Sequence, residues 1–238
     1  MDNHWKKIWG QREVDFGILR GNDRERIFME LKRCSGFDAV GEGLTYETFM
    51  EQYRQIKAAL GVGVNNIKSV YEVGCGSGAN LYLFENDGMV CGGVDYSGKL
   101  VECSKWILKS SDIICAEAID MDVNSQYDAV LSNSVFSYFP NEEYALEVLE
   151  KMFQKAVFSI GIIDIHDEEK KDDFYAYRRT VMEDFDERYK NLSKLFFSKS
   201  FFQEFAEKNQ ADILITNSKM NGYWNNEYVF NCFMYKRM

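Results

Sequence analysis

Residues 69–82 read SVYEVGCGSGANLY, and the rest of the chain can be interpreted outward from this stretch. A β-branched and aromatic run leads into Gly74, Gly76 and Gly78, and a helix-like run follows them. This pattern predicts a strand, a glycine turn and a helix whose free N–H groups and positive dipole end face a ligand. Bare backbone suits a nucleoside-like ligand, although the glycines alone also fit a dinucleotide-binding turn or a turn with no ligand.

On both sides of this turn the sequence alternates between apolar strand-like runs and amphipathic helical runs. Strands are predicted at 69–73, 90–96, 112–118, 127–133 and 157–165, and helices at 45–60, 79–86, 99–110 and 142–156. Such alternation predicts an α/β fold with a parallel sheet and helices on both faces. The runs 211–220 and 227–237, separated by a Gly/Asn turn, predict a closing hairpin, so the last strand is antiparallel. The expected fold is a doubly wound, mostly parallel sheet of seven strands.

The 238 residues are expected to form a single domain, 1–238, because the one proline and the absence of low-complexity sequence leave no linker. Two regions lie outside the strand–helix alternation. One is an N-terminal helical lid at about 1–62, and the other is a charged helical insertion after the fifth strand, at about 167–197. In the segment that follows the insertion, Ser200 and Gln203 fit a capping box.

Composition narrows the class of partner. The formal net charge is −10, whereas a protein that reads phosphate backbones normally presents a basic face, so nucleic acid is not the expected partner. The N-terminus has no signal-peptide core, and no apolar run approaches the roughly 20 residues that span a bilayer, so we expect a cytoplasmic protein without membrane contact. Six scattered cysteines lack metal-ligand spacing and are interpreted as reduced thiols, with no metal site. A monomer or homodimer is expected.

Acidic residues at three strand ends sharpen the interpretation of the glycine turn. Glu72 stands two residues before Gly74, Asp95 ends the second predicted strand, and Glu117 ends the third. A carboxylate in the position of Asp95 can accept two hydrogen bonds from a ribose diol. With YEVGCGSGAN, GGVDYSG, CAEA and YDAVLSNSVFSYF, the chain resembles the class I S-adenosylmethionine (SAM)-dependent methyltransferases over residues 68–165, and by topology over 200–238.

The resemblance implies that SAM is the cofactor and S-adenosylhomocysteine (SAH) the product. It implies that Glu72 and the glycines face the amino-acid part of SAM, that Asp95 binds the ribose, and that Asn133 lies near the methionine end. Tyr96 would flank the adenine, while Glu117 and Ala118 would contact its amino edge. The implied cofactor-binding residues are Glu72, Gly74, Cys75, Gly76, Gly78, Asp95, Tyr96, Glu117, Ala118 and Asn133.

The methyl acceptor should bind beyond the ends of the fourth and fifth strands. His166 follows the fifth strand and is the candidate general base, although a surface-loop histidine is an equally open interpretation. Asp164 and Asp167 flank it and could orient its ring or bind a metal, although no third matching ligand is present. Candidate pocket residues, each of which could instead belong to the core or to a solvated helix face, are Trp5, Trp9, Tyr138, Tyr175 and Arg178.

The expected activity is transfer of a methyl group to an oxygen or nitrogen of a small molecule, such as a metabolite, a sugar or a peptide-like intermediate. The sequence SNSVFSYF after the fourth strand lacks the Asn/Asp-Pro-Pro-aromatic motif of methyltransferases that act on base amines or glutamine amides. Two alternatives remain open: a nicotinamide-dependent Rossmann oxidoreductase, and a non-catalytic SAM-binding or assembly protein. The direction of the last strand discriminates the first alternative.

Overall fold

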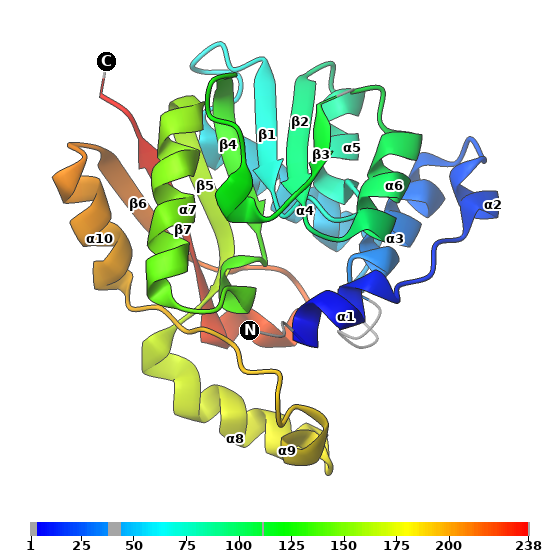
Figure 1. The fold of residues 1–238 in the computed structure, drawn as a ribbon, viewed down its shortest axis with the longest axis vertical. Helices are drawn as coiled ribbons and strands as arrows, with labels where there is room; N and C mark the ends of the chain where they lie inside the picture. The colour runs from blue at the N-terminus through cyan, green and yellow to red at the C-terminus, as the bar shows by residue number, and fades with distance from the viewer. Residues whose placement is uncertain (1–3, 38–43, 111, 238) are drawn as a thin grey trace.

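A computed structural model describes residues 4–37, 44–110 and 112–237, and these residues contain one seven-stranded sheet (Figure 1). Its strands are β1 (Ser69–Val73), β2 (Val90–Asp95), β3 (Ile113–Cys115), β4 (Tyr127–Asn133), β5 (Ala156–His166), β6 (Asp212–Asn217) and β7 (Val229–Tyr235). The order is β3-β2-β1-β4-β5-β7-β6, and β7 pairs antiparallel with both β5 and β6 while the remaining pairs are parallel. The predicted fold class, with its antiparallel C-terminal strand, is confirmed.

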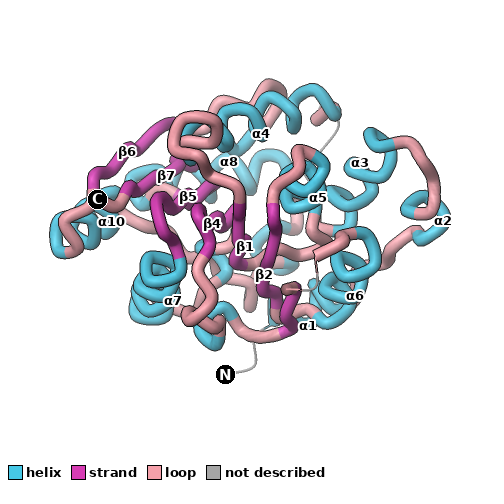
Figure 2. The backbone as a smooth tube through the Cα atoms, turned by 90° about the horizontal axis from the view of Figure 1, so that it is seen from above, coloured by secondary structure: helices cyan, strands magenta, loops and turns pink. Residues whose placement is uncertain are grey.

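Helices cover both faces of the sheet, as Figure 2 shows from above. The α-helices are α1 (His4–Gly10), α2 (Phe16–Leu19), α3 (Arg24–Cys34), α4 (Tyr46–Leu60), α5 (Ala79–Asn86), α6 (Gly98–Ile107), α7 (Glu142–Lys155), α8 (Lys171–Val181), α9 (Phe185–Arg188) and α10 (Lys199–Lys208). The period-2 alternation of the strands divides the core. On β1, Val70 packs into the cluster on the α3–α6 face, and its neighbour Tyr71 packs into the cluster on the α7 and α10 face.

Local sequence signals explain several helix ends. Thr45 caps α4 by accepting a hydrogen bond from the N–H of Thr48, and Gly61 ends the helix in the left-handed conformation. The predicted helix over 79–86 agrees with α5. The capping box at Ser200 and Gln203 is wrong, because α10 begins earlier and its N-cap is Ser198, whose side chain accepts from the N–H of Phe201.

The carboxyl ends of the parallel strands converge on one edge of the sheet, and two segments lie beyond that edge. Figure 1 shows α1, from the N-terminal segment, and α8 with α9, from the segment after β5, on this side. The two segments touch, since the indole Nε1 of Trp5 donates a hydrogen bond to the carbonyl of Ser193 at 3.2 Å. In the described part of the chain, no helix is both long and apolar enough to cross a membrane.

Candidate functional site

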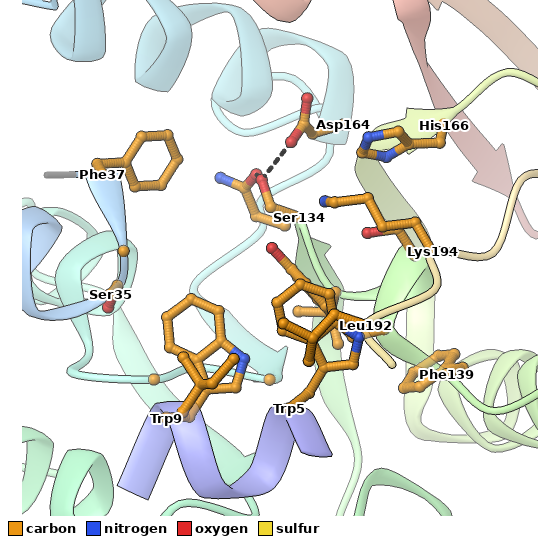
Figure 3. Close-up of a pocket in the computed structure, with 18 of the residues that line it drawn as sticks. Trp5, Trp9, Ser35, Phe37, Ser134, Phe139, Asp164, His166, Leu192 and Lys194 are labelled. Carbon is orange, nitrogen blue, oxygen red and sulfur yellow. Dashed lines mark hydrogen bonds between the residues drawn. The ribbon is translucent and has the colours of Figure 1, made fainter. Parts of the chain in front are cut away.

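A cavity of about 1160 Å³ lies at this edge, slightly above the roughly 300–1,000 Å³ of typical small-molecule sites. Its lining comes from the ends of β1, β2, β4 and β5, from α1 and α3, and from the segment that carries α8 and α9. Figure 3 shows part of this wall, with Trp5 and Trp9 on α1 facing the Ser134–Asp164 pair across the cavity. A volume of this size can hold a nucleoside-sized ligand together with a second molecule.

The glycine turn is held in shape by the neighbouring strand. The N–H groups of Gly74 and Cys75 both donate to the carbonyl of Val94, at 2.8 and 3.1 Å. Gly74 has φ +73°, and a Cβ there would collide with the side chain of Val135. The turn therefore needs glycine both for its left-handed backbone and for its close approach to the loop after β4.

Asp95 at the end of β2 is fixed by the same turn. Its two carboxylate oxygens accept from the N–H of Gly76 at 2.9 Å and the N–H of Ser97 at 2.8 Å. Burial raises the pKa of Asp95, whereas these two backbone hydrogen bonds act to lower it. Each oxygen retains a lone pair, so the carboxylate can still accept a hydrogen bond from a hydroxyl in the cavity.

Glu72, Asn80 and Lys32 form a hydrogen-bonded row beside the glycine turn, in which Glu72 and Lys32 are buried and Asn80 is half-buried. Asn80 donates to Glu72 at 2.6 Å and accepts from the Lys32 ammonium at 3.0 Å. Burial raises the pKa of Glu72 to about 8, with the Asn80 hydrogen bond opposing the rise. Burial also lowers the pKa of Lys32 to about 8, against the attraction of Glu72 and Asp164. The row thus offers both an acidic and a basic group to a charged ligand.

Gly78 departs from the role that the resemblance implies, since it does not line the cavity. It has φ +82°, and a Cβ there would approach within 2.9 Å of the Cβ of Ser104 and 3.0 Å of Leu108 Cδ1. Gly78 therefore permits close packing of the turn against α6 instead of ligand contact.

The other residues that the resemblance implies for SAM do line the cavity. Tyr96 directly follows β2, and Asn133 ends β4. The third strand is shorter than predicted, so Glu117 does not end it but precedes a short 3₁₀ helix, η2 (Ala118–Asp120). Glu117 and Ala118 thus reach the cavity from the loop after β3.

Two cavity-lining residues, one just after β4 and one within β5, have strained backbones. Ser134 has φ +59° and Asp164 has φ +62°, a region that non-glycine residues rarely adopt. Ser134 Oγ donates to Asp164 at 2.7 Å, and the hydroxyl of Tyr223 lies 3.0 Å from both Asp164 oxygens. Asp164 sits where the pairing of β5 with β7 is irregular, and its N–H donates to the side chain of Asn231. The surrounding bonds thus hold this carboxylate at the cavity wall.

His166, the last residue of β5, is not on the surface: it is 2% exposed and lines the cavity. The rings of Phe174 and Phe196 meet it edge to face, at 5.1 and 5.2 Å between centroids. Burial lowers the pKa of His166 well below its usual range, and the positive charge of Lys194 acts in the same direction. The imidazole is therefore neutral at pH 7.

The five candidate pocket residues, Trp5, Trp9, Tyr138, Tyr175 and Arg178, all line the cavity. Tyr138 lies between the two indoles, with ring centroids 4.8 Å from Trp5 and 5.7 Å from Trp9. Arg178 stacks over Trp224 at 5.0 Å and Phe185 at 5.3 Å.

Buried polar atoms without a hydrogen-bond partner among the described residues mark the two ends of the cavity. They include Glu72 Oε2, Asn133 Nδ2, both ring nitrogens of His166 and Asn225 Oδ1, all on cavity-lining residues. Leaving one such group unpaired costs about 1–3 kcal/mol. Glu72 and Asn133 lie where SAM is expected, so the residues present fit that cofactor, and His166 lies beyond them.

The sequence analysis did not identify Lys32, Asn80, Tyr223 or Lys194, which also line the cavity. Lys32 follows Phe28 by four residues and is 3% exposed, so a cation on the apolar face of a predicted helix was the available signal. Tyr223 and Lys194 are brought to the site only by the tertiary fold, and no local pattern marks them.

Residues 71–156 match the family model of a methyltransferase domain. A plantazolicin methyltransferase in complex with a triazolic analogue and SAH has a similar structure, with a TM-score of 0.65, 15% identity, and coverage of 99% of this chain and 100% of that one. Magnesium protoporphyrin IX methyltransferase from Synechocystis PCC 6803 with bound SAH gives a TM-score of 0.61 and 14% identity over 90% of this chain and 100% of that one. No curated protein sequence matches the chain.

The domain match covers the glycine turn, Asp95, Glu117 and β4, which carry the sequence resemblance. The sheet supplies the discriminating feature, because a nicotinamide-dependent Rossmann enzyme more usually ends its sheet in parallel strands, whereas β7 is antiparallel. Residues 71–156 thus match a methyltransferase domain, and the chain has the fold of the class I SAM-dependent methyltransferases.

Proposed function

We propose that the protein transfers the methyl group of SAM to an oxygen or nitrogen of a small-molecule acceptor that enters the cavity beside His166. One observation carries the proposal: a single cavity joins the glycine turn after β1 to the unpartnered imidazole at the end of β5. A protein that only bound SAM would have no need of the second half of this cavity.

The cofactor half uses residues around the turn. Asp95 would accept hydrogen bonds from the ribose hydroxyls, while Tyr96, Glu117 and Ala118 would contact the adenine. Glu72, through its unpartnered Oε2, would accept from the α-ammonium of SAM, and the ammonium of Lys32 would face the carboxylate of SAM. Gly74, Cys75 and Gly76 would give the ligand room at the backbone.

When bound, SAM supplies a methyl group on a positively charged sulfur that is already electrophilic. The protein's contribution is therefore alignment of the acceptor and exclusion of water. The aromatic rings of Trp5, Trp9 and Tyr138 would cover the reacting region, and the N-terminal segment and the 167–197 segment would act as lids. His166, which is neutral and has no hydrogen-bond partner for either ring nitrogen among the described residues, would accept a hydrogen bond from the hydroxyl or amine of the acceptor.

The test is a turnover assay in which purified protein, SAM and pools of hydroxyl- or amine-bearing small molecules are incubated and SAH formation is measured. We expect SAH above the acceptor-free rate in at least one pool. Asp95→Asn should weaken SAM binding at least about tenfold, the equivalent of one charge-assisted hydrogen bond. Asp184→Asn, at an exposed carboxylate outside the cavity, is the matched control.

Two outcomes would contradict the proposal. Calorimetric binding of NADH without binding of SAM would refute the cofactor assignment. Binding of SAM without turnover of any pool would instead favour a non-catalytic SAM-binding protein.

A further inference from the structure

The charges of the cavity wall are arranged differently from those of the whole chain. The chain carries 28 Lys or Arg and 38 Asp or Glu. The cavity lining reverses this balance, with seven Lys or Arg and five Asp or Glu. The wall of the cavity is thus the more basic part of an acidic protein.

The acids and most of the cations come from different parts of the chain, with Arg12 and Lys32 lying outside the cationic segment. Four of the five acidic residues, Glu72, Asp95, Glu117 and Asp164, lie at or just after strand ends or within β5. The segment from α8 to the loop before α10 contributes five cations, Arg178, Arg179, Arg188, Lys190 and Lys194, and a single acid, Asp186. Asp186 already has an ion-pair partner, since its two oxygens lie 2.9 and 3.1 Å from Nε of Arg179.

The carboxylates at the strand ends suit SAM, whose sulfonium and ammonium groups are positive. The cations of the segment from α8 to the loop before α10 lie on the side of the proposed acceptor. In the described part of the chain, no carboxylate lies within ion-pairing distance of Arg178 or Lys194, although both are half-buried. A bound anion would offset the partial desolvation of these two cations.

Aromatic rings hold these two cations in place. Lys194 Nζ lies 4.6 Å from the ring centroid of Tyr138, and Arg178 lies 5.0 Å from that of Trp224. Figure 3 shows the Lys194 side chain extending from the loop before α10 toward His166 and the Ser134–Asp164 pair. Lys194 acts electrostatically on both His166 and Asp164. A charged group held on Lys194 would therefore lie next to the imidazole.

We infer that the acceptor is an anion with an apolar, aromatic body, whose carboxylate or phosphate is held by Lys194 and Arg178 while its rings pack against the aromatic wall. The inference rests on the proposed function, because it names the acceptor class of the same cavity. Ammonium and guanidinium groups form charge-assisted hydrogen bonds with either anion. Rings such as Trp5 and Tyr138 supply the complementary apolar surface.

Three probes with one aromatic body separate charge from ring stacking: 2-naphthoate, 2-naphthyl phosphate and the neutral 2-naphthamide. Each is titrated by calorimetry into protein saturated with SAH and into protein without it. We expect both anions to bind at least about tenfold more tightly than the amide, and the tighter anion identifies the preferred acidic group.

The double variant Arg178→Gln/Lys194→Gln should lower the affinity for both anions about tenfold and change the affinity for 2-naphthamide less than twofold. Lys105→Gln/Lys219→Gln removes the same charge at two exposed positions outside the cavity and should leave all three affinities unchanged. SAH affinity, measured in each variant, verifies that the cofactor half remains folded.

The inference is overturned if neither anion binds at millimolar concentration, if the amide binds as tightly as the anions, or if the control variant weakens anion binding equally. Anion preference in a protein that fails to bind SAH would refute the proposed function and leave the anion site standing. SAH binding without anion preference would refute the anion site alone.

Discussion

Among single residues, Glu72 has the most consequential environment, because its carboxyl is buried where the ammonium group of SAM is proposed to bind. Its pKa is raised to about 8 by burial, so the native protein holds one proton that the unfolded chain releases near pH 4.5. The native state binds more protons across this window, so the Glu72 contribution to the free energy of unfolding falls as pH rises from about 4.5 to about 8. Binding of an ammonium group would instead favour the charged carboxylate.

We therefore predict that SAM binding at pH 6.5 releases close to one proton from Glu72. Lys32, with a pKa of about 8, is already protonated at pH 6.5 and takes up little. Calorimetry in buffers of different ionisation enthalpy measures the release. Glu72→Gln should abolish it and weaken binding at least about tenfold, whereas Glu207→Gln, at an exposed site, should change neither. Proton release that persists in Glu72→Gln would contradict the assignment.

His166 gives a prediction with the opposite sign. Its pKa is depressed by burial, so between that value and about 6.5 the unfolded chain binds the additional proton. The His166 contribution to stability is therefore present above pH 6.5 and is lost as pH falls below it. His166→Phe keeps an aromatic ring beside Phe174 and Phe196 but has no titratable group, so it should remove this loss of stability at low pH.

Urea unfolding measures the difference in free energy of unfolding between His166→Phe and the native sequence. We expect this difference to shift in favour of the variant by about 2 kcal/mol between pH 7.5 and pH 5.0. The figure follows from about 1.4 kcal/mol for each pH unit below 6.5. If the variant and the native sequence show the same pH dependence, the imidazole does not remain neutral in the folded protein.

Among the secondary-structure elements, α10 begins two residues earlier than the predicted capping box, and the position of its N-cap can be tested by stability measurements. Ser198→Ala removes the side-chain acceptor of the Phe201 N–H, which lies 3.2 Å away, and should destabilise the protein by about 1 kcal/mol. Ser200→Ala, at the position predicted from the sequence, should change stability by less than about 0.5 kcal/mol. Urea unfolding of the two variants decides between the caps, and a larger effect at Ser200 would contradict the structure.

The elements that sequence predicted well are those with a strong local signal. The strand–glycine–helix unit over 69–86 and the closing hairpin follow from periodicity and turn residues, and they determine the fold. The residues proposed to hold the cofactor could be expected to lie together, because they follow the ends of neighbouring strands, and all but Gly78 line the cavity. Lys194 and Tyr223, by contrast, reach the cavity through the packing of distant segments, which local periodicity does not encode.

Considered as a whole molecule, the protein builds its cavity from three parts of the chain that are far apart in sequence. The N-terminal segment is tied to the glycine turn, since Ser35 Oγ lies 2.8 Å from Ser77 Oγ and Ser77 Oγ donates to the carbonyl of Leu31. It is also tied to the start of α6, since the N-cap residue Ser97 donates to the carbonyl of Trp9. A ligand on the glycine turn should therefore stabilise α3 as well as the sheet edge.

Amide hydrogen exchange tests this coupling and the role of the N-terminal segment as a lid. A ligand at 100 times its dissociation constant stabilises the states that bind it by about 2.7 kcal/mol, which slows exchange through ligand-releasing openings about 100-fold. With SAH we expect slower exchange in α3 and around residues 74–80, and little change in β6, at the far edge of the sheet. NAD at the same concentration is the control. Protection confined to 74–80 would mean that α3 does not close over the cofactor, and that Lys32 is a structural cation and not a ligand-binding residue.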